Sequence, residues 1–269
     1  MRRVLVDQNT VDVVIAAHNA GHSTLAIARD TSLSPKVVRR VLREHDCAEG
    51  KLTRVRRDMF VPPFTAADAY WLGFLNADGY VNPERGFTRL KLGWIDVDHV
   101  RAFAAYAGLP ADAVRREVNK STGKAQAYVD ITGRAVVDRM VDLGLTGRKA
   151  NRHVVDVDAV LVRHYLRGLV DADGCISRQR LSICCTPVHA QWISTQLTRV
   201  FQLPPRTAYE HMGIKRVYVP KTLTPKVLAW LYTDIPSNTA LPRKLAAAGA
   251  LIRGDDVGED SAEETKISG

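Results

Sequence analysis

The apolar positions between residues 11 and 45 recur every three or four residues, a spacing that predicts short amphipathic helices. We expect a first helix that ends at Gly21, a second from Thr24 to Asp30, and a third from Pro35 to His45. Ser34 followed by proline is a typical N-cap with a proline at the first helical position. The outer side of the third helix is basic.

From residue 66 onward, helical spacing alternates with strict two-residue alternation, the pattern of strands with one buried face. Arg89 and Lys91 would lie on one face of such a strand, with Leu90 and Leu92 on the other. The order helix, strand, strand, helix, strand, strand, helix occurs twice, about 95 residues apart, which indicates an internal duplication. Each repeat is expected to open with a helix. The elements expected after it in the first repeat are strands 80–81 and 87–95, helix 97–107, strands 113–118 and 125–131, and helix 134–143. Those expected in the second repeat are strands 175–177 and 181–184, helix 188–201, strands 206–210 and 215–219, and helix 225–232.

These patterns predict an α+β fold. It would be a pseudo-twofold duplicated α-β-β-α-β-β-α unit with two antiparallel sheets, preceded by a small all-α domain. The expected divisions are a helical domain 1–48, a basic linker 49–65, a first repeat 66–150, a second repeat 151–252 and an acidic, disordered tail 253–269.

Two nine-residue stretches, 71–79 and 166–174, open the two repeats with nearly the same pattern. Each is apolar, has small residues at its third and seventh places, and ends on Asp-Gly. Small residues four apart share one helical face and allow a second helix to approach closely. Asp78 and Asp173 would then meet at the end of the seam, where two carboxylates repel unless a cation lies between them. Core helices with ordinary glycine C-caps would explain the glycines but not the acids.

The chain of 269 residues carries a formal net charge of +9, and its last segment is acidic. The segment from Gly254 onward contains six acidic residues and one lysine. The rest of the chain therefore has a net charge of about +14, as expected of a protein that binds polyanions. A basic surface that only aids solubility is the alternative. The four cysteines have no spacing typical of zinc sites or disulfide frameworks, which favours reduced thiols in the cytoplasm.

The two nine-residue stretches resemble the LAGLIDADG motif of homing endonucleases, in the form that has two motifs in one chain. The second copy departs only at Arg167 and Val170, whereas the first has Asn76 in place of the sixth-position aspartate. The resemblance implies a fold whose polar sheet faces form a saddle over DNA. It also implies a site-specific double-strand DNA endonuclease that holds Mg²⁺ or Mn²⁺ between Asp78 and Asp173.

The resemblance extends to further site residues. It implies Gly79 and Gly174 as additional metal-site residues, and a basic catalytic residue for each half, assigned to Lys149 and Lys244. Ordinary phosphate-contacting lysines are an equal alternative for these two. Strand residues that orient water are not fixed by the sequence, and Gln126 and Lys91 are the candidates.

The first 48 residues resemble the helix-turn-helix of resolvases and transposases, whose third helix lies in the major groove. A plain three-helix packing unit is the alternative. The expected DNA contacts are basic residues of the third helix, the linker and the strands, namely Lys36, Arg39, Arg40, Arg43, Arg54, Arg56, Arg57, Arg89, Lys91 and Arg180.

Two functions remain open. One is the endonuclease, acting as a monomer on a long, asymmetric duplex site in a prokaryotic or phage-encoded setting, with no membrane involvement. The other is a non-cleaving regulator or intron-splicing maturase that uses the same fold. Regulators of the WhiA type join this fold to a helix-turn-helix, but carry that module after the fold. No motif typical of other nuclease or nucleotide-binding sites appears.

Overall fold

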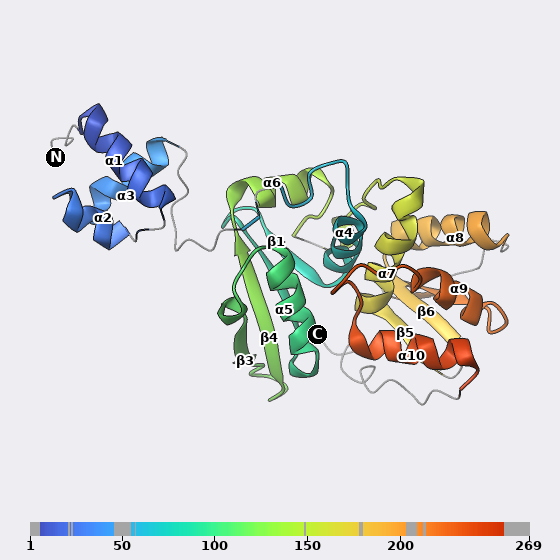
Figure 1. The fold of residues 1–269 in the computed structure, drawn as a ribbon. Coiled ribbons are helices and arrows are strands. Elements are labelled where there is room, and N and C mark those ends of the chain that lie inside the picture. Colours follow the sequence, from blue (N-terminus) through green and yellow to red (C-terminus); the bar gives the residue numbers. More distant parts are fainter. Residues whose placement is uncertain are drawn as a thin grey trace. The chain divides into compact units, whose positions relative to one another are not determined.

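The computed structural model describes residues 6–20, 22, 24–45, 55–56, 58–147, 149–177, 180–202, 209–211 and 214–255. The chain divides into two compact units, Met1–Arg54 and Val55–Gly269 (Figure 1). The division falls inside the segment expected to be a linker. Arg54, Arg57 and the tail beyond residue 255 lie outside the described residues, so the predictions made for them stay predictions.

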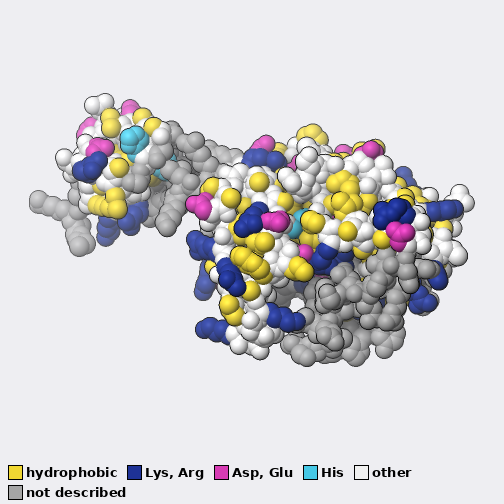
Figure 2. Space-filling model, turned by 60° about the horizontal axis from the view of Figure 1, so that its bottom comes forward, with side chains coloured by type: hydrophobic (Ala, Val, Ile, Leu, Met, Phe, Trp, Pro, Cys, Tyr) yellow, Lys and Arg dark blue, Asp and Glu magenta, His cyan; other side chains and the backbone are white. Residues whose placement is uncertain are grey.

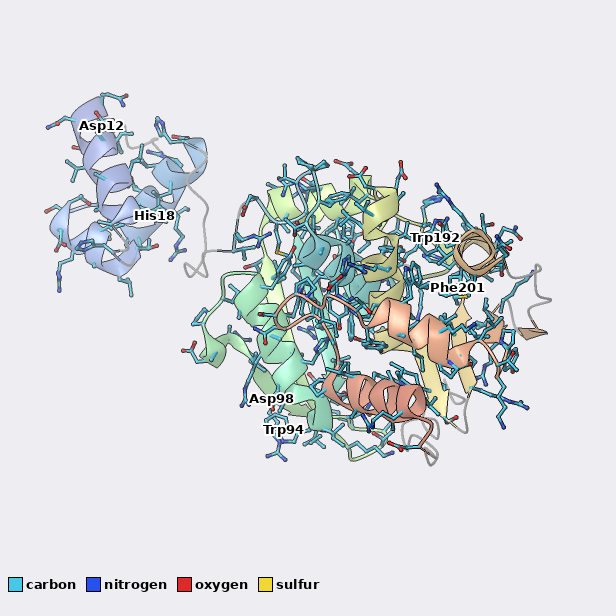
Figure 3. All side chains as sticks on the ribbon, turned by 45° about the vertical axis from the view of Figure 1, so that its right-hand side comes forward. Asp12, His18, Trp94, Asp98, Trp192 and Phe201 are labelled. Carbon is cyan, nitrogen blue, oxygen red and sulfur yellow. The ribbon has the colours of Figure 1, made fainter. Side chains whose placement is uncertain are left out.

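The first unit contains the three helices that the periodicity predicts: α1 (Gln8–Asn19), α2 (Thr24–Asp30) and α3 (Pro35–Glu44). Asp7 caps α1, because its Oδ1 accepts a hydrogen bond of 2.9 Å from the Thr10 amide. His18 of α1, labelled in Figure 3, is buried beside the apolar side chains that join the helices. That core consists of Val11, Val14, Ile27, Ala28, Val38, Val41 and Leu42.

The second unit contains two copies of one arrangement, which confirms the predicted α+β fold. The first copy comprises α4 (Ala66–Asp78), β1 (Gly79–Asn82), β2 (Phe87–Gly93), α5 (Val97–Tyr106), β3 (Arg115–Val118), β4 (Ala125–Thr132) and α6 (Arg134–Asp142). The second comprises α7 (Val162–Asp173), β5 (Gly174–Ser177), β6 (Arg180–Cys185), α8 (Pro187–Phe201), β7 (Tyr209–His211), β8 (Ile214–Val219) and α9 (Thr224–Leu231).

Both copies form four-stranded antiparallel sheets of the same topology, β1-β2-β4-β3 and β5-β6-β8-β7 (Figure 1). In the first sheet, Leu90, Leu92, Val129 and Ile131 are buried on one face, as the alternation predicts. The structure adds a last helix, α10 (Pro242–Arg253), that the sequence analysis did not predict. Its signals were available, since proline opens it and Gly254 ends it at a φ of 86°. No helix in the described part of the chain has the length and hydrophobicity to cross a bilayer.

Helices α4 and α7 pack against each other at the centre of the unit, which confirms their predicted contact (Figure 1). The approach is so close that a Cβ on Gly73 would lie 2.1 Å from the carbonyl oxygen of Tyr165. A Cβ on Gly168 would lie 2.1 Å from the carbonyl oxygen of Tyr70. Both obstacles are backbone atoms, so glycine is required at both positions.

Replacing either Gly73 or Gly168 by alanine will force the two helices apart. We expect each change to lower the free energy of unfolding by about 3 kcal/mol, because the surrounding backbone cannot yield without repacking the core. Urea unfolding followed by tryptophan fluorescence measures this for the second unit, since all four tryptophans lie there.

Gly93→Ala is the matched control, because the nearest atom to a Cβ there is the end of the Ile95 side chain at 3.8 Å. Equal effects of Gly93→Ala and Gly73→Ala would contradict the assigned role of the helix crossing.

Candidate active site

The two motif aspartates occupy matching places in the two copies. Asp78 is the last residue of α4, Asp173 is the last residue of α7, and a strand starts at the next residue in each case. Helices α4 and α7 are packed against each other, so both aspartates belong to the central helix pair. The duplicated motif therefore positions both acids through backbone packing.

Arg152 connects these two helix ends electrostatically. Its buried guanidinium donates to three backbone oxygens at the end of α4: those of Leu75 at 3.0 Å, Asn76 at 2.7 Å and Gly79 at 2.6 Å. Burial lowers the pKa of Arg152, while Asp173 and Asp78 both act in the opposite direction. Both carboxylates thus lie within electrostatic reach of one buried cation. Sequence reasoning missed Arg152, although it lies only three residues after Lys149.

Lys149 adds a second cation at the same place. It belongs to a single 3-10 turn, Lys149–Asn151, and its ammonium contacts the Asp173 carboxylate as an ion pair. The Asp173 side chain is 7% exposed and that of Lys149 is 46% exposed, so the lysine covers the acid from the solvent side. A residue that closes the first repeat therefore serves the acid of the second.

Lys244 corrects the expectation of matching catalytic lysines. It is only 3% exposed and its ammonium donates to the carbonyl oxygen of Gly174 at 2.6 Å. That position offsets the negative end of α7, as Arg152 does for α4. The structural counterpart of Lys244 is therefore Arg152 and not Lys149.

The same contacts correct the expected metal ligands. The carbonyl oxygens of Gly79 and Gly174 accept hydrogen bonds from Arg152 and Lys244. An oxygen that already accepts from a cation is a poor ligand for a divalent metal, because the two positive charges repel. The candidate metal ligands are thereby reduced to the carboxylates of Asp78 and Asp173.

The sixth motif positions join the two helices through hydrogen bonds. Asn76 donates from Nδ2 to the Tyr165 hydroxyl at 2.8 Å, while Tyr70 donates to Oδ2 of Asp171 at 2.8 Å. Burial raises the pKa of Asp171 to about 6, although its hydrogen-bond donors and Arg167 act against this. The substitution of asparagine for aspartate in the first motif is therefore a change in helix packing.

Candidate DNA contacts on the first sheet are paired with acids. Arg89 makes two hydrogen bonds to Asp130, of 2.6 and 2.8 Å, and Lys91 contacts Glu117 at 3.0 Å. Gln126, a candidate for orienting water, keeps a buried Oε1 that has no hydrogen-bond partner among the described residues. DNA phosphates would have to compete with these carboxylates. Arg180, at the start of β6, is exposed.

The candidate contacts on α3 differ in exposure. Lys36 and Arg39 are exposed, whereas Arg40 is half-buried and lies 3.9 Å from Glu44. The side chain of Arg43 lies outside the described set. Figure 2 shows Lys and Arg side chains on the surface of both units.

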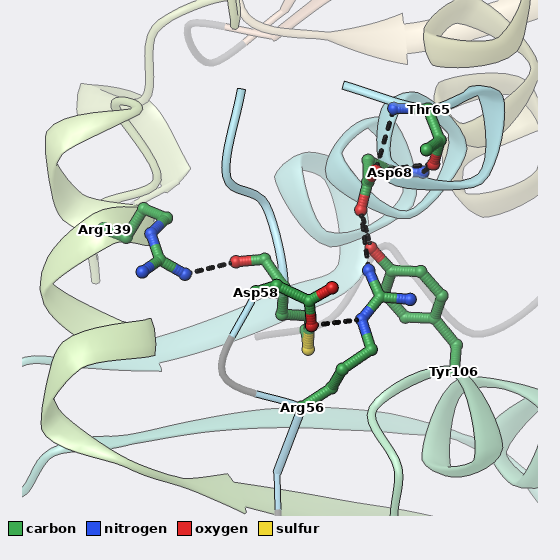
Figure 4. A network of polar contacts seen from close by, with 7 residues as sticks. Arg56, Asp58, Thr65, Asp68, Tyr106 and Arg139 are labelled. Atoms are coloured by element: carbon green, nitrogen blue, oxygen red, sulfur yellow. Dashed lines mark hydrogen bonds and ion pairs between the residues drawn. The ribbon is translucent and has the colours of Figure 1, made fainter. Parts of the chain in front are cut away.

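Arg56 corrects the expectation that it tracks DNA. Figure 4 shows its guanidinium among Asp58, Asp68 and Tyr106, with ion-pair distances of 3.1 Å to Asp58 and 3.2 Å to Asp68. The guanidinium also lies 4.6 Å from the centre of the Tyr106 ring. Asp68 in turn forms a capping box with Thr65 at the start of α4. Arg56 therefore anchors the segment that leads into the first motif helix.

Comparison with solved structures finds similar folds of two kinds. Full-length WhiA from Thermatoga maritima matches with a TM-score of 0.47 and 16% identity, over 75% of this chain and 65% of its own. The homing endonuclease I-WcaI bound to its DNA recognition sequence matches with a TM-score of 0.49 and 12% identity, over 71% and 89%. I-DmoI in complex with DNA and Ca matches with a TM-score of 0.45 and 15% identity, over 70% and 97%.

The chain thus spans about two-thirds of the length of WhiA. All three TM-scores are below 0.5, so these likenesses carry no argument about function. No protein-family model and no curated protein matches the chain.

Replacing Arg152 by methionine will remove the cation that the end of α4 and both aspartates share. We expect the free energy of unfolding to fall by about 3 kcal/mol or more, since three buried carbonyl oxygens lose a charged donor. Urea unfolding monitored by tryptophan fluorescence measures it.

Arg101→Gln is the control, because Arg101 is exposed and bonded only to Asp98 among the contacts described for it. A loss no greater than that of the control would show that Arg152 is not what holds this helix end.

Proposed function

We propose that this protein is a metal-dependent double-strand DNA endonuclease of the LAGLIDADG type, with Asp78 and Asp173 as its metal-holding acids. The observation that carries the proposal is the pairing of these two acids at the ends of α4 and α7, both within reach of Arg152. Helix packing alone would not require an aspartate at the C-terminal end of each of the two helices.

The donor chemistry fits a hard divalent cation. Two carboxylates supply anionic oxygen ligands, and Mg²⁺ takes few protein ligands because it retains several waters. In the described part of the chain no three His, Cys, Asp or Glu side chains are arranged to hold a metal ion. A metal bound there would activate water and stabilise charge on the reacting phosphate. Lys149 would turn from Asp173 toward that phosphate.

The same ion pair favours a second function, a DNA-binding regulator that does not cut. Lys149 already neutralises Asp173, and a metal would have to displace it. A protein in which this pair is permanent would keep the fold and the charge but lack the metal. The two functions differ in one measurable property, metal-dependent cleavage.

Binding is proposed to involve both units. The basic charge outside the tail suits a polyanion, and α3 presents Lys36 and Arg39 to solvent. Because the two repeats differ in sequence and lie in one chain, a monomer would contact a long site whose halves are unlike. Arg180 is a further proposed contact; Arg89 and Lys91 would contribute once their partner acids are displaced.

Asparagine in place of Asp78 or Asp173 should abolish cutting while preserving DNA binding. Each change removes a metal ligand and also removes a negative charge near the phosphates, so affinity should stay level or rise slightly. The target can be obtained by selecting bound duplexes from a random pool in EDTA. Cleavage of the selected duplex is then measured in Mg²⁺ and in Mn²⁺.

Asp171→Asn is not a suitable control, because that acid holds α4 and α10 in place. Asp112→Asn is suitable, since Asp112 is exposed in a short turn of the first repeat. If the unmodified protein binds its selected duplex tightly but never cuts it, the regulator is favoured. If both Asn variants still cut, the acids are not the metal ligands.

Changing Lys36 and Arg39 together to glutamine should weaken binding of the selected duplex. Loss of two phosphate contacts should reduce the slope of log Kd against log salt by about 2. Fluorescence anisotropy at several salt concentrations measures both quantities.

Arg29→Gln on α2 is the matched control, since Arg29 is another exposed arginine of the same unit. Unchanged affinity and slope in the double variant would assign α3 a different role.

A further inference from the structure

A small pocket lies beside Asp173 in the second copy. Its polar lining comes from Asn76, Lys149, Asp173, Cys184, Thr186 and His189. Four of these belong to the second repeat, Asn76 comes from α4, and Lys149 comes from the turn that contacts Asp173. The pocket therefore adjoins one of the two proposed metal ligands.

Two polar atoms of this lining are buried without a hydrogen-bond partner in the part of the chain that the structure describes. They are Oδ1 of Asn76 and Nε2 of His189, which is only 3% exposed as a residue. A buried polar atom without a partner is costly, and native proteins commonly satisfy one with bound solvent or a ligand. Two such atoms in one pocket, next to a carboxylate and an ammonium, are the partners that a bound water needs.

The His189 ring is fixed in its orientation. Thr186 caps α8, and its hydroxyl lies 2.8 Å from Nδ1 of His189. Burial, with smaller contributions from the positive charges of Lys149 and Arg152, lowers the pKa of His189 to about 4, and Asp173 acts in the opposite direction. The imidazole is therefore neutral at neutral pH, and Nε2 keeps one hydrogen bond to give or to accept.

The first copy has a histidine at the corresponding place, but it is used differently. His99 is the third residue of α5, as His189 is the third residue of α8. Its Nε2 lies 3.0 Å from the Tyr70 hydroxyl. Because Tyr70 donates its proton to Asp171, His99 must donate to Tyr70. This ring is therefore satisfied inside the core, and the two copies are unlike at this position.

We propose that His189 is a positioning residue on the Asp173 side of the active site. There its Nε2 and the side-chain oxygen Oδ1 of Asn76 orient the water that attacks one DNA strand. This inference rests on the proposed endonuclease function. The oriented water gives up a proton to bulk solvent as its oxygen bonds to phosphorus. The bond from phosphorus to the leaving deoxyribose oxygen breaks, and that oxygen takes up a proton. In the first copy the corresponding histidine, His99, is bonded to Tyr70 and is not available for this role.

The test is a strand-resolved cleavage assay with the full-length protein. The selected duplex carries a different fluorescent label on each strand, and single-turnover rates are measured in Mg²⁺. We expect His189→Leu to slow cutting of one strand at least tenfold and of the other less than twofold, so that nicked duplex accumulates. His189→Gln, which restores a polar atom, should recover part of the lost rate.

His99→Leu is the matched control. It removes the bond to Tyr70, so it should lower the midpoint of thermal unfolding and affect both strands alike. His189→Leu should lower that midpoint less than His99→Leu does, because the bond that it removes, to Thr186, is only partly buried whereas the bond from His99 to Tyr70 is fully buried.

The outcomes separate the two proposals. If the unmodified protein cuts both strands but His189→Leu slows them equally, or slows neither, the role of His189 is overturned and the endonuclease function stands. A large fall in the unfolding midpoint of His189→Leu, with no rescue by glutamine, would also overturn it. If the unmodified protein cuts neither strand, both proposals fall.

Discussion

The contact between the backbones of α4 and α7 determines the geometry of the rest of the second unit. Because Gly73 and Gly168 have no side chains, each helix lies against a carbonyl oxygen of the other. At that separation Tyr70 can reach Asp171 across the seam, and Asn76 can reach the hydroxyl of the opposite tyrosine. The crossing, the tyrosines and the sixth motif positions thus form one reciprocal arrangement that also brings the two helix ends together.

Bringing those ends together has an electrostatic cost. The C-terminus of a helix carries partial negative charge, and here each helix also ends in an aspartate. Arg152 and Lys244 offset the charge of the buried carbonyl oxygens at the helix ends, and Lys149 offsets the charge of Asp173. The site is thus already balanced in part by its own cations. A metal that binds there must contend with Lys149 as well as with water.

The sequence was sufficient for the fold and for the two acids because both depend on local, periodic patterns. Alternation predicted the strands, and the repeated Asp-Gly endings indicated the paired carboxylates. The basic residues could not be assigned in this way. Lys149 and Lys244 follow arginines in matching positions, yet one contacts a carboxylate and the other a backbone oxygen. Arg56 looked like a free linker cation until its acidic partner in α4 was known. Such roles depend on contacts between residues far apart in sequence.

A duplicated fold in one chain allows each half to change separately. In a dimer of identical subunits, every residue of one half would recur in the other. Here the sixth motif position is Asn76 in one copy and Asp171 in the other, and each makes a different set of hydrogen bonds. His99 and His189 diverge in the same way, one bonded within the core and the other bordering the acids' site. The shared frame is held by the glycine crossing, so differences at the helix ends do not disturb it. The two half-sites can therefore have unlike chemistry without loss of the fold.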